Sequence, residues 1–135
     1  MADSAAEVEA SAAVVREEAG NQVRLMTDRL VALLDFLEDD PNDEFTRFAL
    51  AQEYAKRGNR EEALRYYEHL VETSPGYVGT YYHLGKLLED LDRTDDAKDI
   101  YRTGIRIAEE QRDAHARAEL NDALLQLDGL GWDDL

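Results

Sequence analysis

A repeat of 34 residues is the feature that most limits the fold of this chain. Its only two prolines, Pro41 and Pro75, lie 34 residues apart, and periods of this length are typical of stacked helical units. Shifting the sequence by 34 brings small and aromatic residues together in the same order. The matched pairs are Leu50 with Leu84, Ala51 with Gly85, Tyr54 with Leu88, Ala63 with Ala97 and Tyr67 with Tyr101.

The first unit predicts two helices, because apolar and small residues recur at helical spacing over about residues 43–57 and again to about residue 73. Gly58 ends the first helix as a left-handed C-cap. Asn59 begins the second, with Glu62 in the capping-box position. Pro75 ends the unit, since proline has no N–H to donate to a helix.

The second unit predicts helices over about 78–91 and 95–110, joined by a turn at 92–94. Gly104 lies inside the later helix, where glycine costs about 1 kcal/mol relative to Ala. A glycine in that place predicts that a neighbouring helix crosses close to it.

Two units alone leave apolar faces open, since about three repeats are usually needed for stability. A helix over about 21–39 carries the stripe Val23, Met26, Leu30, Leu33 and Leu37, and looks like the second half of an absent repeat. A helix over about 113–127 carries the stripe Ala116, Leu120, Ala123, Leu124 and Leu127. The outer face of this last helix holds Arg112, Arg117, Glu119 and Asp122, as expected of a solvated cap.

The expected organisation is therefore an all-α domain over 21–127, with repeats at about 44–77 and 78–111 and the cap at 113–127. Residues 1–20 are rich in Ala and Glu with weak periodicity, which predicts a frayed or disordered segment. Residues 128–135 are expected to form a loose acidic tail, in which Trp132 would be free or would dock on a partner or on the groove.

The charge excludes some partners. Lys and Arg total 15 against 31 Asp and Glu, for a net charge of −16, and such a field repels nucleic acid and anionic membranes. One explanation is adaptation to a salty cytoplasm, because at about 1 M salt the screening length falls to roughly 3 Å. In that case thermal stability rises markedly from low salt to about 1 M. The other explanation is simply an acidic soluble protein.

No apolar run is long enough to span a membrane, and residues 1–15 do not resemble a signal peptide, so a cytoplasmic location is expected.

The repeated residues resemble the tetratricopeptide repeat family, whose motif is a large apolar residue, Leu-Gly, Tyr, Ala, an aromatic, a small residue and Pro. The second unit carries Tyr81, Leu84, Gly85, Leu88, Ala97, Tyr101 and Gly104, and the first carries Leu50, Ala51, Tyr54, Ala63, Tyr67 and Pro75. The match covers about residues 41–110. The chain departs from the motif at Arg47, Leu70, Leu88 and Glu109. The first two departures would loosen local packing, and the last indicates a longer final helix pair.

The resemblance implies a short right-handed superhelix of antiparallel helix pairs, with a peptide or protein segment held in a concave groove. Carried over residue by residue, the groove positions are Phe45, Phe48, Gln52, Ala55, Lys56, Gly79, Tyr82, Lys86 and Glu89. Some relatives clamp the C-terminal carboxylate of heat-shock chaperones with Lys, Asn and Arg. Here the matching positions hold Phe48, Gln52, Tyr82 and His83, so chaperone clamping is not expected.

Two readings of these groove residues stay open. Phe45, Phe48 and Tyr82 would form a platform for an apolar peptide, or they would pack under the helix of 21–39 or the C-terminal cap. Lys86 would anchor an acidic group of a partner, or it would pair with Glu89 or Asp90 on its own helix.

No residue pattern indicates catalysis, a metal or a cofactor. The chain has no cysteine, and His69, His83 and His115 lie in three different predicted helices without metal-ligand spacing. The carboxylate pairs at 61–62 and 95–96 stand in first helical turns, where negative charge is favoured by the helix dipole.

Three functions follow as hypotheses. The first is an adaptor that binds an apolar or basic protein segment. The second is a structural protein that forms a homodimer through its terminal helices. The third, an enzyme, lacks any set of residues that converges on a reaction.

Overall fold

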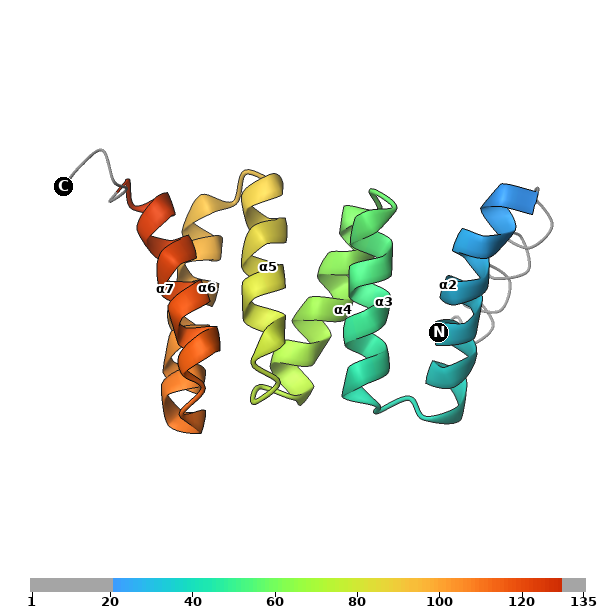
Figure 1. Ribbon diagram of the computed structural model, residues 1–135, viewed down its shortest axis with the longest axis horizontal. Coiled ribbons are helices and arrows are strands. Elements are labelled where there is room, and N and C mark those ends of the chain that lie inside the picture. The colour runs from blue at the N-terminus through green and yellow to red at the C-terminus, as the bar shows by residue number, and fades with distance from the viewer. Residues whose placement is uncertain (1–20, 130–135) are drawn as a thin grey trace.

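A computed structural model describes the backbone of residues 21–129 and the side chains of residues 29–129. Within that range every element of regular secondary structure is a helix. Its elements are α2 (Asn21–Asp39), α3 (Glu44–Lys56), α4 (Arg60–Thr73), α5 (Gly79–Asp90), α6 (Thr94–Gln111) and α7 (Ala114–Leu127). Figure 1 shows them side by side as a helical repeat superhelix, with α3 and α7 in front of α4 and α6. The expectations for residues 1–20 and for Trp132 lie outside the described residues.

Polar side chains begin three of the helices. The Asp43 carboxylate accepts a hydrogen bond from the Thr46 N–H at 3.1 Å, and Asp113 does the same for Ala116 at 3.0 Å. Asn59 accepts from the Glu62 N–H at 3.4 Å, which is the cap predicted from the sequence. Each of these contacts satisfies a backbone donor that the helix itself leaves unpaired.

The turn inside each repeat follows one pattern. Gly58 has φ +80°, and Asp92, which is 34 residues later, has φ +58°. The next N–H closes the turn in both repeats, from Asn59 to the Tyr54 carbonyl and from Arg93 to the Leu88 carbonyl, each at 2.9 Å. Asp tolerates the left-handed conformation better than most side chains, so the second repeat makes the same turn without glycine.

The main core runs through α3 to α7. Its largest fully buried side chains include Tyr67, Tyr81 and Tyr101, together with Leu70, which is completely inaccessible. Leu70, one of the two departures from the motif expected to loosen packing, is thus a fully buried core residue. The expectation for the last pair is confirmed, because α6 has 18 residues and α4 has 14.

Two of the helical glycines of the second repeat, Gly85 and Gly104, mark close helix contacts. A Cβ at Gly104 would lie 2.5 Å from the Tyr81 Cβ on α5 and 3.0 Å from Leu120 Cδ1 on α7. A Cβ at Gly85 would lie 2.1 Å from Tyr101 Cε1. Both distances are shorter than a side-chain carbon allows, so the predicted close crossing at Gly104 is confirmed.

The helix α2 covers α3 through a separate small core. Leu30, Val31, Leu33 and Leu34 are buried there against Ala49 and Leu50, and Leu37 packs at the edge. Val31 and Leu34 were not part of the predicted stripe, while the side chains of Val23 and Met26 lie outside the described residues. Glu53 of α3 is buried beneath this joint, 3.1 Å from Arg29 Nε of α2 and 3.2 Å from Arg57 Nε.

The helix α7 closes the other end. Leu120 and Ala123 are buried against the main core, and Leu124 and Leu127 pack at its border. The predicted outer residues Arg112, Arg117, Glu119 and Asp122 are all exposed. Lys98 of α6 holds Asp128, just after α7, at 3.1 Å.

Candidate peptide-binding face

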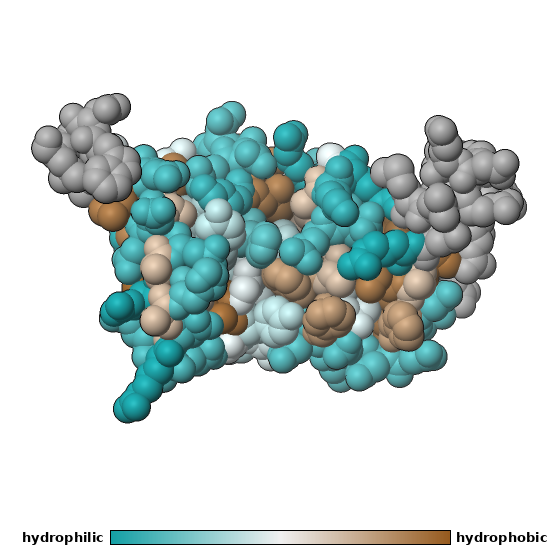
Figure 2. Space-filling view, in the orientation of Figure 1, coloured by the Kyte–Doolittle hydropathy of each residue, from teal (hydrophilic) through white to brown (hydrophobic). Residues whose placement is uncertain are grey.

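The helices α3, α5 and α7 lie next to one another and form one face of the array, the face seen in Figure 2. The groove residues inferred from the sequence are at least partly accessible: Phe45, Phe48, Gln52, Ala55, Lys56, Tyr82 and Lys86. Figure 2 shows hydrophobic surface over α3 and between α3 and α5, within a hydrophilic surround.

Phe48 is the centre of an aromatic cluster that joins three elements. Its ring lies 5.2 Å from Tyr77, 5.3 Å from His83 and 6.1 Å from Tyr67, measured between centroids. A Cβ on Gly79 would lie 3.6 Å from Phe48 Cζ, so the ring also rests on the start of α5. Phe48 therefore packs against α4 and α5, rather than under α2 or the cap.

Phe45 differs from Phe48 although both stand on α3. Phe45 is 64% exposed, so its ring does not pack under α2 or the cap. Full burial of a phenylalanine ring contributes about 1.5–3 kcal/mol. A partner that covers the exposed ring of Phe45 therefore gains part of that free energy on binding.

Tyr82 and Lys86 form a second feature of the face. Lys86 Nζ lies 5.6 Å from the centre of the Tyr82 ring and 3.6 Å from Glu89 Oε2. The ion pair with Glu89 is the alternative left open by the sequence, and the structure contains it. With Glu119, Asp122, Ala123 and Gln126 of α7, these two residues line a small pocket of about 150 Å³.

His83 and Tyr77 belong to this face but were not identified as groove residues from the sequence. Burial lowers the pKa of His83 below its usual value, an effect that Glu119 opposes, and the imidazole is therefore neutral at pH 7. A neutral ring suits stacking on Tyr67, whose centroid is 6.5 Å away at 10°. The only sequence signal for Tyr77 was its place directly after the Pro75 turn.

The described side chains supply no metal centre, since none of the His, Asp and Glu residues in 29–129 gather in groups able to hold an ion. His69 lies away from this face, and burial together with Arg47 lowers its pKa. Among the helices that the structure describes, none combines the length and apolarity needed to cross a bilayer.

Comparison with known proteins agrees with this architecture. Residues 54–120 match a family model described as tetratricopeptide repeat. The crystal structure of a tetratricopeptide repeat domain protein from Salinibacter ruber is 57% identical, with a TM-score of 0.63, and the match covers 66% of this chain and 100% of that chain. This chain belongs to the tetratricopeptide repeat family.

Two further structures extend the comparison. A solution NMR structure of a tetratricopeptide repeat domain protein from Salinibacter ruber is 58% identical over 67% of this chain and 92% of that chain, with a TM-score of 0.64. The crystal structure of MamA shares the fold at 18% identity, with a TM-score of 0.54 over 73% of this chain and 66% of that chain. A search of curated proteins found no match. The tetratricopeptide fold suggests a protein–protein interaction module.

Proposed function

We propose that this tetratricopeptide repeat protein is a non-catalytic adaptor that holds a segment of a partner protein across the face formed by α3, α5 and α7. The observation that carries the proposal is the exposed ring of Phe45 beside the packed ring of Phe48 on the same helix. A few large side chains that become buried in an interface carry most of its binding energy, so the exposed Phe45 ring is a candidate anchor for a partner.

The face also limits the chemistry of the segment. Phe45 and the edge of the Phe48 cluster suit a large apolar side chain, whereas Glu119 and Asp122 on α7 disfavour acidic neighbours. With a net charge of −16, the protein attracts basic segments and repels acidic ones. The proposed ligand is an apolar segment flanked by neutral or basic residues.

Selection from a library of random peptides displayed on phage tests this function. The selected peptides are expected to carry an aromatic or large aliphatic residue and to lose at least about tenfold in affinity, or about 1.4 kcal/mol, on Phe45→Ala. Leu125→Ala is the matched control, because Leu125 is also an exposed apolar residue (44%) but lies on α7 outside the pocket lining. No enrichment of apolar peptides, or equal losses in the two variants, contradicts the proposal.

Self-association is the second candidate, and Phe36 of α2 favours it with 61% of its side chain exposed. Position 36 matches Leu70 and Gly104 by the 34-residue period, and both of those are buried against a neighbouring helix. A second copy would cover the ring by pairing α2 across a two-fold axis. Sedimentation at increasing concentration separates the candidates, since a monomer at all concentrations rules out the dimer.

A further inference from the structure

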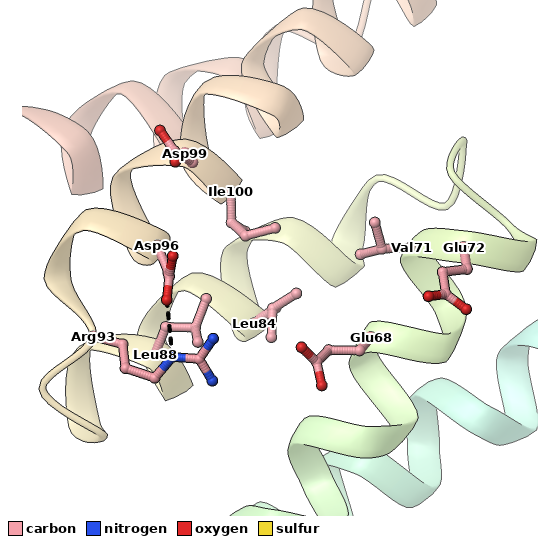
Figure 3. A pocket seen from close by; sticks show the side chains of 9 residues that line it. All are labelled: Glu68, Val71, Glu72, Leu84, Leu88, Arg93, Asp96, Asp99 and Ile100. Atoms are coloured by element: carbon pink, nitrogen blue, oxygen red, sulfur yellow. Dashed lines mark hydrogen bonds and ion pairs between the residues drawn. The ribbon is translucent and has the colours of Figure 1, made fainter.

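A second groove lies between α4 and α6, on the other side of the array from Phe45 and Tyr82. Its volume is about 290 Å³. Figure 3 shows Leu84 of α5 near Ile100 of α6 and Val71 of α4, and Leu88 of α5 beside Arg93. Leu84 and Leu88 are buried, so the accessible apolar surface at this opening comes from Val71 and Ile100, which pack against the main core.

Carboxylates surround this apolar floor. Glu68 and Glu72 line it from α4, and Asp96 and Asp99 line it from α6. Arg93 is the single cation among the nine lining residues, and its Nε is 2.9 Å from Asp96 Oδ2. Asp99 pairs with Arg102, 3.3 Å away. Two of the four carboxylates are thus matched by an arginine, and Glu68 and Glu72 leave the groove with a net negative charge.

The position of Arg93 indicates which kind of side chain fits this groove. Figure 3 shows its guanidinium over Leu88, at the same opening as the Glu68 carboxylate. Its methylene stem can cover apolar surface while its charged end meets a carboxylate. A partner that brings further Arg or Lys side chains repeats this contact against Glu68 and Glu72, and its apolar residues cover Val71 and Ile100.

We propose that the groove between α4 and α6 binds a basic amphipathic segment of a partner protein, in which Lys or Arg flank large apolar side chains. Charge complementarity is the reason for this choice of occupant. A second copy of the chain, at −16, meets electrostatic repulsion. Residues 130–135 contain two Asp and no base, so the chain's own C-terminus does not fit the groove either.

The inference is independent of the proposed function, because it concerns the opposite face and different residues. The probe is a synthetic amphipathic peptide of Leu and Lys, and its counterpart has Glu in place of every Lys. Affinity is measured by fluorescence anisotropy at fixed salt, and methyl NMR locates the site. The Lys peptide is expected to bind and to shift the methyl signals of Val71 and Ile100, while the Glu peptide does not bind.

Two double variants with the same charge change separate this groove from the general acidity of the protein. Glu68→Gln with Glu72→Gln is expected to weaken binding at least about tenfold. Glu109→Gln with Glu110→Gln, on exposed positions of α6 outside the groove, is expected to weaken it less than about threefold. Circular dichroism shows whether each variant keeps its helices.

Three results overturn the proposal. Equal weakening in the two double variants assigns the binding to net charge alone. Peptide-induced shifts of the Ala55 and Ala123 methyl signals, without shifts at Val71 and Ile100, place the peptide on the α3–α5–α7 face. Failure of the Lys peptide to bind the wild-type protein removes the groove as a site for basic segments.

Discussion

The first repeat carries Arg47 where the second carries Tyr81, and Leu70 where the second carries Gly104. In the second repeat the large side chain between the two helices is Tyr81 of α5. It is 1% exposed, and Gly104 leaves room for it. In the first repeat the large side chain between the two helices is Leu70 of α4, which is completely buried. Arg47 instead turns toward the preceding loop, and its Nε donates to the Pro41 carbonyl at 2.8 Å.

This difference teaches that the repeat fixes the volume between its two helices rather than the residue that fills it. By analogy with Tyr81 and Gly104, we infer that Arg47 and Leu70, two departures from the family motif, compensate each other within the first repeat. Close packing explains the coupling, because a core tolerates changes of side chain when the total volume is kept.

The strongest test of that comparison transfers the arrangement of one repeat to the other. Leu70→Gly is expected to lower the free energy of unfolding by about 4 kcal/mol, through the cavity and the poor helix propensity of glycine. Adding Arg47→Tyr is expected to recover at least about 1 kcal/mol by filling the cavity from α3. Urea denaturation measures both, and no recovery in the double variant means that the two positions do not share a space.

A smaller effect is expected where the repeats differ at Ala51 and Gly85. Gly85→Ala places a Cβ against the buried ring of Tyr101, and overpacking of this kind costs about 2 kcal/mol even though Ala is the better helix former. Ala51→Gly, the reverse change in the first repeat, is expected to cost about 1 kcal/mol. Thermal unfolding measures both variants, and a Gly85→Ala protein that is more stable than wild type contradicts the close contact.

The paired tyrosines Tyr67 and Tyr101 sharpen the comparison further. The Tyr101 hydroxyl donates to the Glu89 carboxylate, and burial together with this bond raises the pKa of Tyr101. Burial alone raises the pKa of Tyr67. Tyr101→Phe is therefore expected to cost about 1.5 kcal/mol, because hydrogen bonds to charged groups are the stronger ones. Tyr67→Phe is the control and is expected to stay within about 0.5 kcal/mol of wild type. Equal losses in urea denaturation contradict the assignment.

The smallest effect concerns Ala49 and His83, which also lie 34 residues apart. Ala49 is covered by the leucines of α2, whereas His83 meets the rings of Phe48 and Tyr67. Since burial lowers the pKa of His83 in the folded state, the unfolded chain binds its proton more readily. The contribution of the neutral imidazole to the free energy of unfolding is fully present above about pH 6.5. It is lost as the pH falls below that value.

NMR titration of the imidazole checks this expectation, with the His83→Gln variant used to assign the signal. The His83 pKa is expected below 6.5. The loss of stability on acidification is expected to be smaller in the variant than in the wild-type protein. A His83 pKa above 6.5 contradicts the buried, neutral ring.

Much of the fold was predictable because its signals are local or periodic. The period of 34 predicted the paired helices, Asn59 predicted the N-cap of α4, and Gly104 predicted a close helix crossing. Each of these depends on backbone chemistry within one turn of helix or on spacing along the chain. Asp92 gave no such signal, because its left-handed conformation follows from its place in the repeat rather than from its residue type.

The candidate sites were less predictable, because helical spacing gives the direction of a side chain but not what covers it. Phe45 and Phe48 stand three residues apart on one helix. Only the position of α5 packs Phe48 against the core and leaves Phe45 exposed. The buried Glu53 likewise became an ion-pair centre only when α2 brought Arg29 to it.

The sequence by itself determined the helices, their pairing and the acidic surface, since these depend on propensity, period and charge. Only the tertiary structure determined where that surface forms a groove. The groove between α4 and α6 draws its lining from three helices and from residues 68–100. Its apolar floor meets its carboxylates only after the two repeats stack, because contacts between distant residues depend on the angle and distance between packed helices.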